Sequence, residues 1–250
     1  MIFVSVRLNG SRPLSFVLDT GSARNLIDRT LAVGLGFKTG GTGSLQGAGA
    51  GRVPISFIHG VSLALPGLES AGYEFSTADL QPLATSLGVK VDPRIRCLQP
   101  LRRDRGLPGE TSDVHSAGSL RPPNGAAEEL PIEMREKWAF VKAVLVLPGP
   151  VAVQDSFLID SGSSDAVDHP IVMHLQSRAS GTSGVGLGAP IQGATAHAAS
   201  FRLGRYSVTG PMVSCCGATD ATSKLIGNEV LRHFAVTFDY PSSRIFITPN

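Results

Sequence analysis

The sequence has 250 residues and a formal net charge of +2, with 42% hydrophobic and 17% charged residues. So small a net charge gives no electrostatic reason to expect a nucleic-acid or membrane partner, and no apolar run is long enough for a transmembrane helix. With 29 Gly, 17 Pro and 6% aromatic residues, the composition favours a β-rich, loop-rich globular protein over a helical bundle, in one large domain or two lobes.

The chain opens with two strand-like segments, residues 3–8 and 14–18, on either side of Asn9-Gly10. Strand, Asn-Gly, strand is the strongest short-range signal of a β-hairpin. The second segment includes the apolar run Phe16-Val17-Leu18, yet it leads directly into Asp19. An ionised carboxylate at the end of an apolar strand is costly unless it is paired or hydrogen-bonded.

After Asp19 the sequence predicts a short helix at residues 29–35 and a Gly-rich loop from Gly40 to Arg52. Residues 93–125 break the pattern, because they are rich in Arg, Pro and Gly and show neither a strand nor a helix period. One interpretation is a disordered linker between two lobes. The other is a stretch translated out of frame, because favourable codons for residues 94–111, read one nucleotide later, give a sequence similar to the end of the second half. The nucleotide sequence decides between the two.

The second half repeats the order of the first. Strand-like residues 139–159, interrupted by a turn, lead to Asp160 as the opening hairpin leads to its aspartate. A short helix at residues 169–175 and a Gly-rich loop from Gly188 to Ala199 follow, and the chain closes with a hairpin that turns at residues 240–243. Such an internal repeat predicts two similar lobes.

The two acidic turns, Asp19-Thr20-Gly21-Ser22 and Asp160-Ser161-Gly162-Ser163, share one pattern. If they meet between the lobes, the carboxylates of Asp19 and Asp160 cannot both ionise cheaply, and one proton is held between them. One carboxylate then acts as a general base on a water molecule, while the protonated one donates to a substrate carbonyl oxygen. The alternative is that each aspartate only caps its own turn.

The other residues of the turns suit such a meeting. The glycine of each turn lets the backbone bend tightly and approach the opposite turn. Thr20 and Ser161 offer hydroxyls that can tie the turns together, and Ser22 and Ser163 can donate to a carboxylate.

With these motifs the sequence resembles the pepsin/retropepsin-like aspartic peptidases, in particular two-lobed bacterial members. The resemblance also includes the hydrophobic-hydrophobic-Gly element Leu225-Ile226-Gly227, and it covers residues 2–90 and 138–250. It implies a mostly β fold of two similar retropepsin-like lobes, related by a pseudo-twofold axis with the active site between them. The expected organisation is a lobe at 1–92, an irregular segment at 93–127 and a second lobe at 128–250.

The resemblance further implies an aspartic endopeptidase in which Asp19 and Asp160 are catalytic and the remaining motif residues support the active-site loops. It implies hydrolysis by an activated water with no covalent intermediate, cofactor or metal. The expected partner is a peptide or protein substrate and the expected state a monomer, without nucleic acid or membrane span. Family members of this kind are often exported or periplasmic, but residues 1–10 lack the features of a signal peptide, so the compartment stays open.

Two departures from the family pattern leave alternatives open. The first lobe has no counterpart of Leu225-Ile226-Gly227, since "PRIRC" stands where it is due, and the lobe is therefore expected to be incomplete. No flap tyrosine is evident, so the Gly-rich loops Gly40 to Arg52 and Gly188 to Ala199 are either flaps or plain β-connections. The competing functions are a peptide-binding or structural protein that keeps the fold without turnover, and a chain that does not fold stably.

Other residues point to no further chemistry. Cys97, Cys215 and Cys216 make no metal spacing and no disulfide framework. His169 and His174 do not share a helical face well, so a metal site is not expected there. Lys137-Trp138 is interpreted as a solvated lead into a strand.

Overall fold

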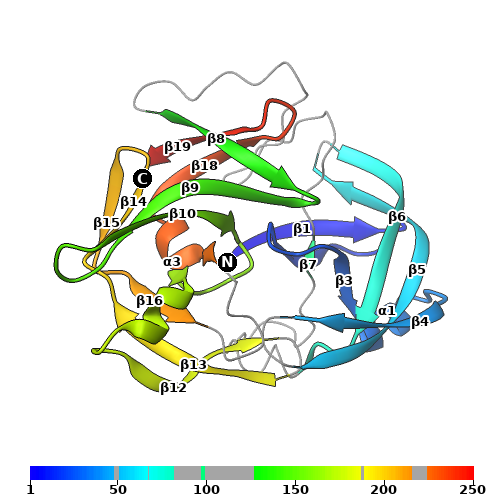
Figure 1. The fold of residues 1–250 in the computed structure, drawn as a ribbon. Helices are drawn as coiled ribbons and strands as arrows, with labels where there is room; N and C mark the ends of the chain where they lie inside the picture. Colours follow the sequence, from blue (N-terminus) through cyan, green and yellow to red (C-terminus); the bar gives the residue numbers. More distant parts are fainter. Residues whose placement is uncertain (48–50, 67, 82–96, 99–126, 187–188, 216–223) are drawn as a thin grey trace.

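The computed structural model describes residues 1–47, 51–66, 68–81, 97–98, 127–186, 189–215 and 224–250. The described chain is mostly β, as predicted, and its strands form two sheets, one from each half of the chain (Figure 1). None of the helices in these ranges is long and apolar enough to cross a membrane.

The first sheet has seven strands in the order β1-β2-β7-β3-β6-β5-β4, and β1 also pairs with β5. Its elements are β1 (Ile2–Leu8), β2 (Leu14–Leu18), β3 (Asn25–Asp28), α1 (Arg29–Gly34), β4 (Gly40–Gln46), β5 (Arg52–Leu65), β6 (Leu68–Ala78) and β7 (Cys97–Leu98). The helix predicted at residues 29–35 is confirmed as α1, which Asp28 begins by accepting a hydrogen bond from the Leu31 N–H.

The second sheet has twelve strands, with β12-β13-β16-β11-β17-β10-β9-β8-β19-β18 as its main path and β14 joining β9 to β15. Its strands are β8 (Glu128–Arg135), β9 (Trp138–Val146), β10 (Ala152–Ile159), β11 (Val167–Asp168), β12 (Ala179–Gly186), β13 (Ala189–His197), β14 (Ser200–Leu203), β15 (Tyr206–Thr209), β16 (Met212–Cys215), β17 (Leu225–Ile226), β18 (Phe234–Asp239) and β19 (Arg244–Pro249). Its helices are the 3-10 helix η1 (Pro170–His174), within the predicted 169–175, and α3 (Asn228–Leu231).

The opening hairpin forms where the sequence predicts it. Asn9 and Gly10 have φ angles of 47° and 73°, and the Ser11 N–H donates to the Leu8 carbonyl at 2.9 Å. Positive φ at two successive residues matches the right-handed twist of the flanking strands, so this dipeptide brings β2 back along β1.

The strand before each aspartate is anchored in an apolar core. Phe16 of β2 is fully buried and lies edge-on to Phe75, with ring centroids 6.1 Å apart. Phe157 of β10 is buried in the same way against Phe201 at 5.1 Å. Edge-to-face aromatic pairs are worth about 1 kcal/mol beyond their buried area, so the cores hold the strand ends that carry the two turns.

The structure places a strand in the first sheet where the sequence analysis expects a gap. In the second sheet, Leu225–Ile226 runs parallel to β10, with Ile226 opposite Ile159. In the first sheet, Cys97–Leu98 runs parallel to β2 in the same way, with Leu98 opposite Leu18. The expectation that the first half lacks a counterpart of the Leu225–Ile226 strand is therefore wrong as regards the backbone. Parallel pairing needs only main-chain groups, so the strand forms although the sequence differs.

The remainder of the predicted irregular segment, residues 93–96 and 99–126, lies outside the described residues. Neither the linker nor the out-of-frame interpretation is tested by the structure.

Candidate active site

The structure brings the two acidic turns together. Thr20 and Ser161, the residues after the two aspartates, are 5% and 4% exposed. The Thr20 hydroxyl donates to the Ile159 carbonyl at 2.6 Å, and the Ser161 hydroxyl donates to the Leu18 carbonyl at 2.7 Å. Each hydroxyl also accepts the backbone N–H of the other residue, at 3.1 and 2.9 Å. These reciprocal bonds join the ends of β2 and β10.

The glycines of the turns face the opposite aspartates. A Cβ atom added to Gly21 would lie 2.4 Å from Cγ of Asp160, and one added to Gly162 would lie 2.4 Å from Cγ of Asp19. No side chain fits at such distances, so glycine is needed at both positions for the two carboxylates to approach each other.

Backbone N–H groups point at both carboxylates. The Gly21 N–H donates to Asp19 Oδ1 at 3.0 Å, and the N–H groups of Gly162 and Ser163 donate to Asp160 Oδ1 at 2.8 and 3.2 Å. Such bonds favour the ionised form of a carboxylate, so they oppose the effect of burial.

The net effect on Asp160 is a raised pKa. Burial is the largest cause and the neighbouring Asp19 carboxylate the next, and together they raise the pKa of Asp160 to about 7 against the two backbone hydrogen bonds. Two carboxyl groups so placed share one proton, and the titration belongs to the pair. One group is then able to accept a proton while the other donates one.

The seryl side chains of the turns bond differently from the prediction. The Ser22 hydroxyl donates to the Arg24 carbonyl at 2.7 Å, and the Ser163 Oγ accepts the Asp165 N–H at 3.1 Å. Neither of these bonds reaches a carboxylate of the pair. The Ser22 hydroxyl instead closes its own turn, which residues of this type do readily, and the Ser163 hydroxyl bonds to the carboxyl group of Asp165.

The Leu225-Ile226-Gly227 element lies beneath the second turn. The Asp160 N–H donates to the Ile226 carbonyl at 2.9 Å. A Cβ on Gly227 would meet the Asp165 carbonyl oxygen at 2.3 Å, so the chain passes this point too closely for a side chain. The element therefore fixes the backbone of the second turn from below.

Sequence reasoning missed Asn228, the next residue. Its side-chain amide donates to the carbonyls of both Ser161 and Ser163 at 2.7 Å. An amide N–H₂ group has two protons, and here both hold the loop that carries Asp160. An Asn directly after the glycine was the available signal, although its partners are visible only in the fold.

Comparison with known protein families gives a match in the first half of the chain. The family described as "Aspartyl protease" matches residues 4–92. The matched part of the chain includes the first acidic turn and the β4–β5 hairpin, whereas the second turn lies beyond it.

Among solved structures, the chain is similar to a retropepsin-like aspartic protease from Rickettsia conorii. The two chains are 15% identical, and the similarity covers 51% of this chain and 96% of the other with a TM-score of 0.37. No curated protein matches the chain.

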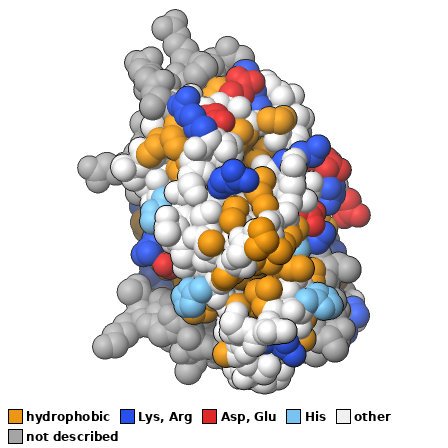
Figure 2. Space-filling view, turned by 60° about the vertical axis from the view of Figure 1, so that its left-hand side comes forward, with side chains coloured by type: hydrophobic (Ala, Val, Ile, Leu, Met, Phe, Trp, Pro, Cys, Tyr) orange, Lys and Arg blue, Asp and Glu red, His pale blue; other side chains and the backbone are white. Residues whose placement is uncertain are grey.

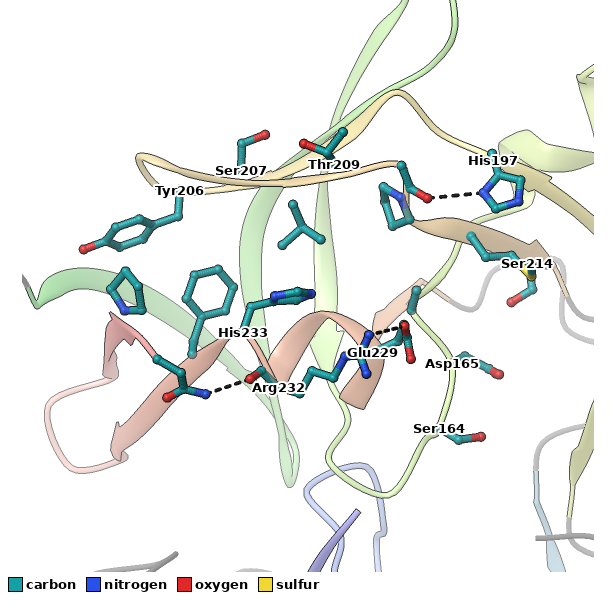
Figure 3. Close-up of a pocket in the computed structure, with 18 of the residues that line it drawn as sticks. Ser164, Asp165, His197, Tyr206, Ser207, Thr209, Ser214, Glu229, Arg232 and His233 are labelled. Carbon is teal, nitrogen blue, oxygen red and sulfur yellow. Dashed lines mark hydrogen bonds and ion pairs between the residues drawn. The ribbon is translucent and has the colours of Figure 1, made fainter. Parts of the chain in front are cut away.

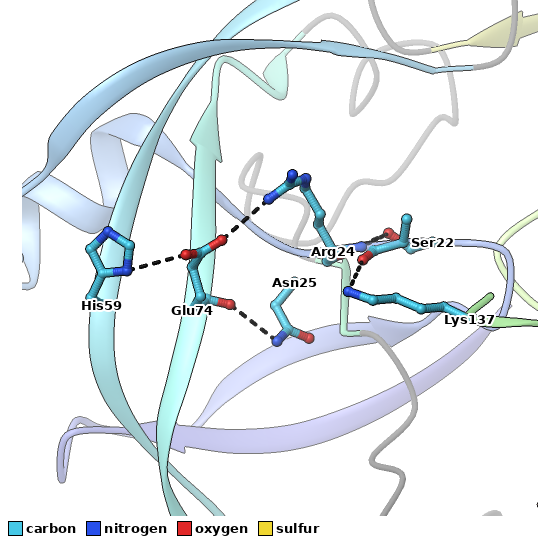
Figure 4. Close-up of polar contacts among 7 residues, drawn as sticks. Ser22, Arg24, Asn25, His59, Glu74 and Lys137 are labelled. Carbon is cyan, nitrogen blue, oxygen red and sulfur yellow. Dashed lines mark hydrogen bonds and ion pairs between the residues drawn. The ribbon is translucent and has the colours of Figure 1, made fainter.

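The interpretation of Lys137-Trp138 as a solvated lead is wrong for the tryptophan. The indole N–H of Trp138 donates to the Gly21 carbonyl at 2.9 Å, although Gly21 follows β2 of the first sheet and Trp138 begins β9 of the second. Lys137 is exposed, and its ammonium lies 3.4 Å from the Ala23 carbonyl (Figure 4). The turn between β8 and β9 therefore contacts the first acidic turn.

A polar network flanks the first turn on its other side. Arg24 pairs with Glu74 at 3.2 Å, and His59 lies 3.1 Å from the same carboxylate. The Asn25 amide donates to the Glu74 carbonyl at 3.3 Å, as Figure 4 shows. The side chains of Arg24, His59 and Glu74 are largely exposed, so the charged contacts add little stability. The network links β3, β5 and β6 beside the turn.

A cavity of about 900 Å³ lies in the second half, between β15 and α3 (Figure 3). Its lining includes Asp165, His197, Tyr206 and His233 but neither aspartate of the pair. Burial raises the pKa of Asp165, against a hydrogen bond from Ser163.

The space-filling view shows hydrophobic side chains gathered on one face of the molecule (Figure 2).

The Gly-rich loops form hairpins. The range from Gly40 to Arg52 contains β4 and the first residue of β5, and the range from Gly188 to Ala199 contains all of β13, which pairs with β12. Residues 48–50 and 187–188 lie outside the described ranges. Within those ranges, no group of three or more His, Cys, Asp or Glu side chains is placed to hold a metal ion.

Proposed function

We propose that this chain is an aspartic endopeptidase with two pseudo-symmetric lobes. Asp19 is the catalytic aspartate of the first lobe and Asp160 that of the second. The proposal is carried by the reciprocal hydrogen bonds of Thr20 and Ser161, which bring the two acidic turns to one place. If each aspartate only capped its own turn, the opposite turn would not need a glycine to leave room for the carboxylate. The match of residues 4–92 to the family described as "Aspartyl protease" supports the same proposal.

In this mechanism the aspartate pair shares one proton before the reaction. The ionised carboxylate removes a proton from a water molecule, whose oxygen attacks the carbonyl carbon of the peptide bond. The protonated carboxyl donates to the carbonyl oxygen, and a tetrahedral diol forms. The proton taken from the water then passes to the amide nitrogen and the C–N bond breaks. A hydroxyl of the diol gives its proton back to the pair as the carboxylic acid product forms, which restores the shared proton.

The hairpins β4–β5 and β12–β13 suit an extended substrate. In Figure 1 they extend toward each other from the two sheets. An extended peptide can add main-chain hydrogen bonds to exposed strands, so the substrate class is a peptide or a protein segment without regular structure.

The test is cleavage of a fluorogenic peptide library between about pH 3 and 7 by the unmodified chain, Asp19→Asn and Asp160→Asn. We expect cleavage by the unmodified chain and its loss in both variants, with folding retained. Cleavage that neither substitution changes would refute the proposal.

A specific observation favours a second candidate, a peptide-binding protein without turnover. By the register of β7 and β17, Gln99 follows Leu98 where Gly227 follows Ile226. In the second half a side chain at Gly227 would meet backbone at 2.3 Å, and the first half has no glycine at the corresponding sequence position. Peptide binding by the unmodified chain with no cleavage at any pH would favour this candidate.

A further inference from the structure

We propose that Trp138 is a positioning residue for Asp19 and acts on it through Gly21. The effect of Trp138 on catalysis rests on the proposed function, whereas the contact between Trp138 and Gly21 does not depend on that function. Trp138 is the first residue of β9, opposite Arg135 across the tight turn that joins β8 to β9. Its half-buried indole N–H donates to the Gly21 carbonyl at 2.9 Å, which satisfies a polar group that needs a partner when it leaves water.

Gly21 passes this constraint to the aspartate. The N–H of the same residue donates to Asp19 Oδ1 at 3.0 Å. Glycine has the widest backbone freedom of all residues, so a bond that fixes its carbonyl also limits where its N–H points. Trp138 thus holds the Gly21 N–H in line with the carboxylate of Asp19.

The two turns differ in what holds them. The second turn is held from within its own half by Asn228, whose amide bonds to the Ser161 and Ser163 carbonyls. By the register of β7 and β17, the residue in the corresponding sequence position of the first half is Pro100. Proline has no side-chain amide and no backbone N–H, so it cannot supply the two bonds that Asn228 makes.

Trp138 supplies a hold on the first turn from the opposite half. The neighbouring Lys137 contact to Ala23 is longer, at 3.4 Å, and exposed. It therefore provides a matched control, because Lys137→Ala removes a contact to the same turn from the same hairpin without touching Gly21.

The sharpest variant replaces Trp138 by its benzothienyl analogue, in which sulfur takes the place of the indole N–H and the ring shape is kept. Trp138→Phe is the genetically encoded counterpart. We expect both to lower kcat by about tenfold, the order of one hydrogen bond, with KM little changed. The acid limb of the kcat/KM profile should move to higher pH, because the Gly21 N–H that favours the ionised form of Asp19 is no longer held in line with the carboxylate. Lys137→Ala should leave both parameters within about twofold of the unmodified chain, as expected for an exposed contact.

A second readout does not depend on activity. Trp138 is the single tryptophan of the chain, so intrinsic fluorescence reports its surroundings alone. We expect its emission to titrate with the aspartate pair in the unmodified chain, and this titration to disappear in Asp19→Asn, whose urea unfolding midpoint serves as the check on folding.

The two readouts separate the two proposals. Emission that follows the pair in a chain that cleaves no peptide supports the Trp138 contact and overturns the peptidase. Cleavage by a chain in which the benzothienyl analogue and Trp138→Phe behave like Lys137→Ala overturns the positioning role and leaves the peptidase standing.

Discussion

Thr20 and Ser161 each donate a hydroxyl hydrogen bond to the carbonyl that precedes the other's aspartate, at 2.6 and 2.7 Å. Both side chains are buried, so water cannot readily take the place of either hydroxyl as the hydrogen-bond donor to these carbonyls. The join between the two halves is therefore a polar contact that is costly to break on one side only.

Thr20→Val should show that cost. The change keeps the shape of the side chain but leaves the Ile159 carbonyl and the Ser161 N–H without their Thr20 partner. We expect a loss of about 2 kcal/mol in the free energy of unfolding, measured by urea denaturation. Ser22→Ala is the control, because its hydroxyl bonds only within an exposed turn, and equal losses in the two variants would contradict the role given to Thr20.

Gly21→Ala should disable the pair without a catalytic group being removed. The added methyl would lie 2.4 Å from Cγ of Asp160, so the carboxylate or the turn must shift, at about 1 to 3 kcal/mol for overpacking. We expect peptide cleavage to fall below detection. Gly34→Ala, at the end of α1 with nothing within 4 Å of the new methyl, should be neutral or slightly stabilising; retained cleavage by Gly21→Ala would rule out the close approach.

Stability should fall as pH rises through the range in which the aspartate pair loses its shared proton. Because the pKa of Asp160 is raised from 3.8 to about 7, the folded chain binds a proton there that the unfolded chain has released. The stabilisation is complete below pH 3.8 and is lost as pH approaches 7, by up to about 4 kcal/mol at 1.36 kcal/mol per pKa unit. Urea midpoints of the unmodified chain should therefore decline over this window, and those of Asp160→Asn should decline less; parallel curves would contradict the raised pKa.

Asp155 should give a pH dependence of opposite sign. Burial alone would raise its pKa, but the Lys224 ammonium at 2.6 Å, the Ser156 N–H and His169 hold the pKa below its usual range. A lowered pKa gives stability that is present above pH 3.8 and lost as pH falls. Lys224→Met should therefore cost about 1 kcal/mol at pH 7 and less at pH 3, as thermal unfolding at the two pH values would show. A loss that is equal at both would exclude the ion pair as its cause.

The local elements could be predicted from the sequence because their signals are local. The Asn9-Gly10 hairpin, the helix after Asp28 and the β-rich composition depend on neighbouring residues, and each is present. The meeting of the two acidic turns was predicted from a repeated motif, since two similar strand ends each need a partner for their carboxylate.

The rest depends on contacts between distant residues. Trp138 reaches Gly21 across the two sheets, and no spacing in the sequence indicates that approach. Cys97–Leu98 forms a strand of two residues in a segment without periodicity, because its pairing with β2 and β3 comes from backbone groups alone. Asn228 could be noticed but not interpreted, since its two carbonyl partners lie in another loop.

The most direct measurement of the central claim is a kinetic cycle of Asp19→Asn, Asp160→Asn and the double variant on one cleaved peptide. If the two carboxylates act as one unit through a shared proton, each single change removes nearly all activity and the double variant loses no more than either. Losses that multiply in the double variant, or a single variant that keeps its activity, would contradict the claim that Asp19 and Asp160 work as a pair.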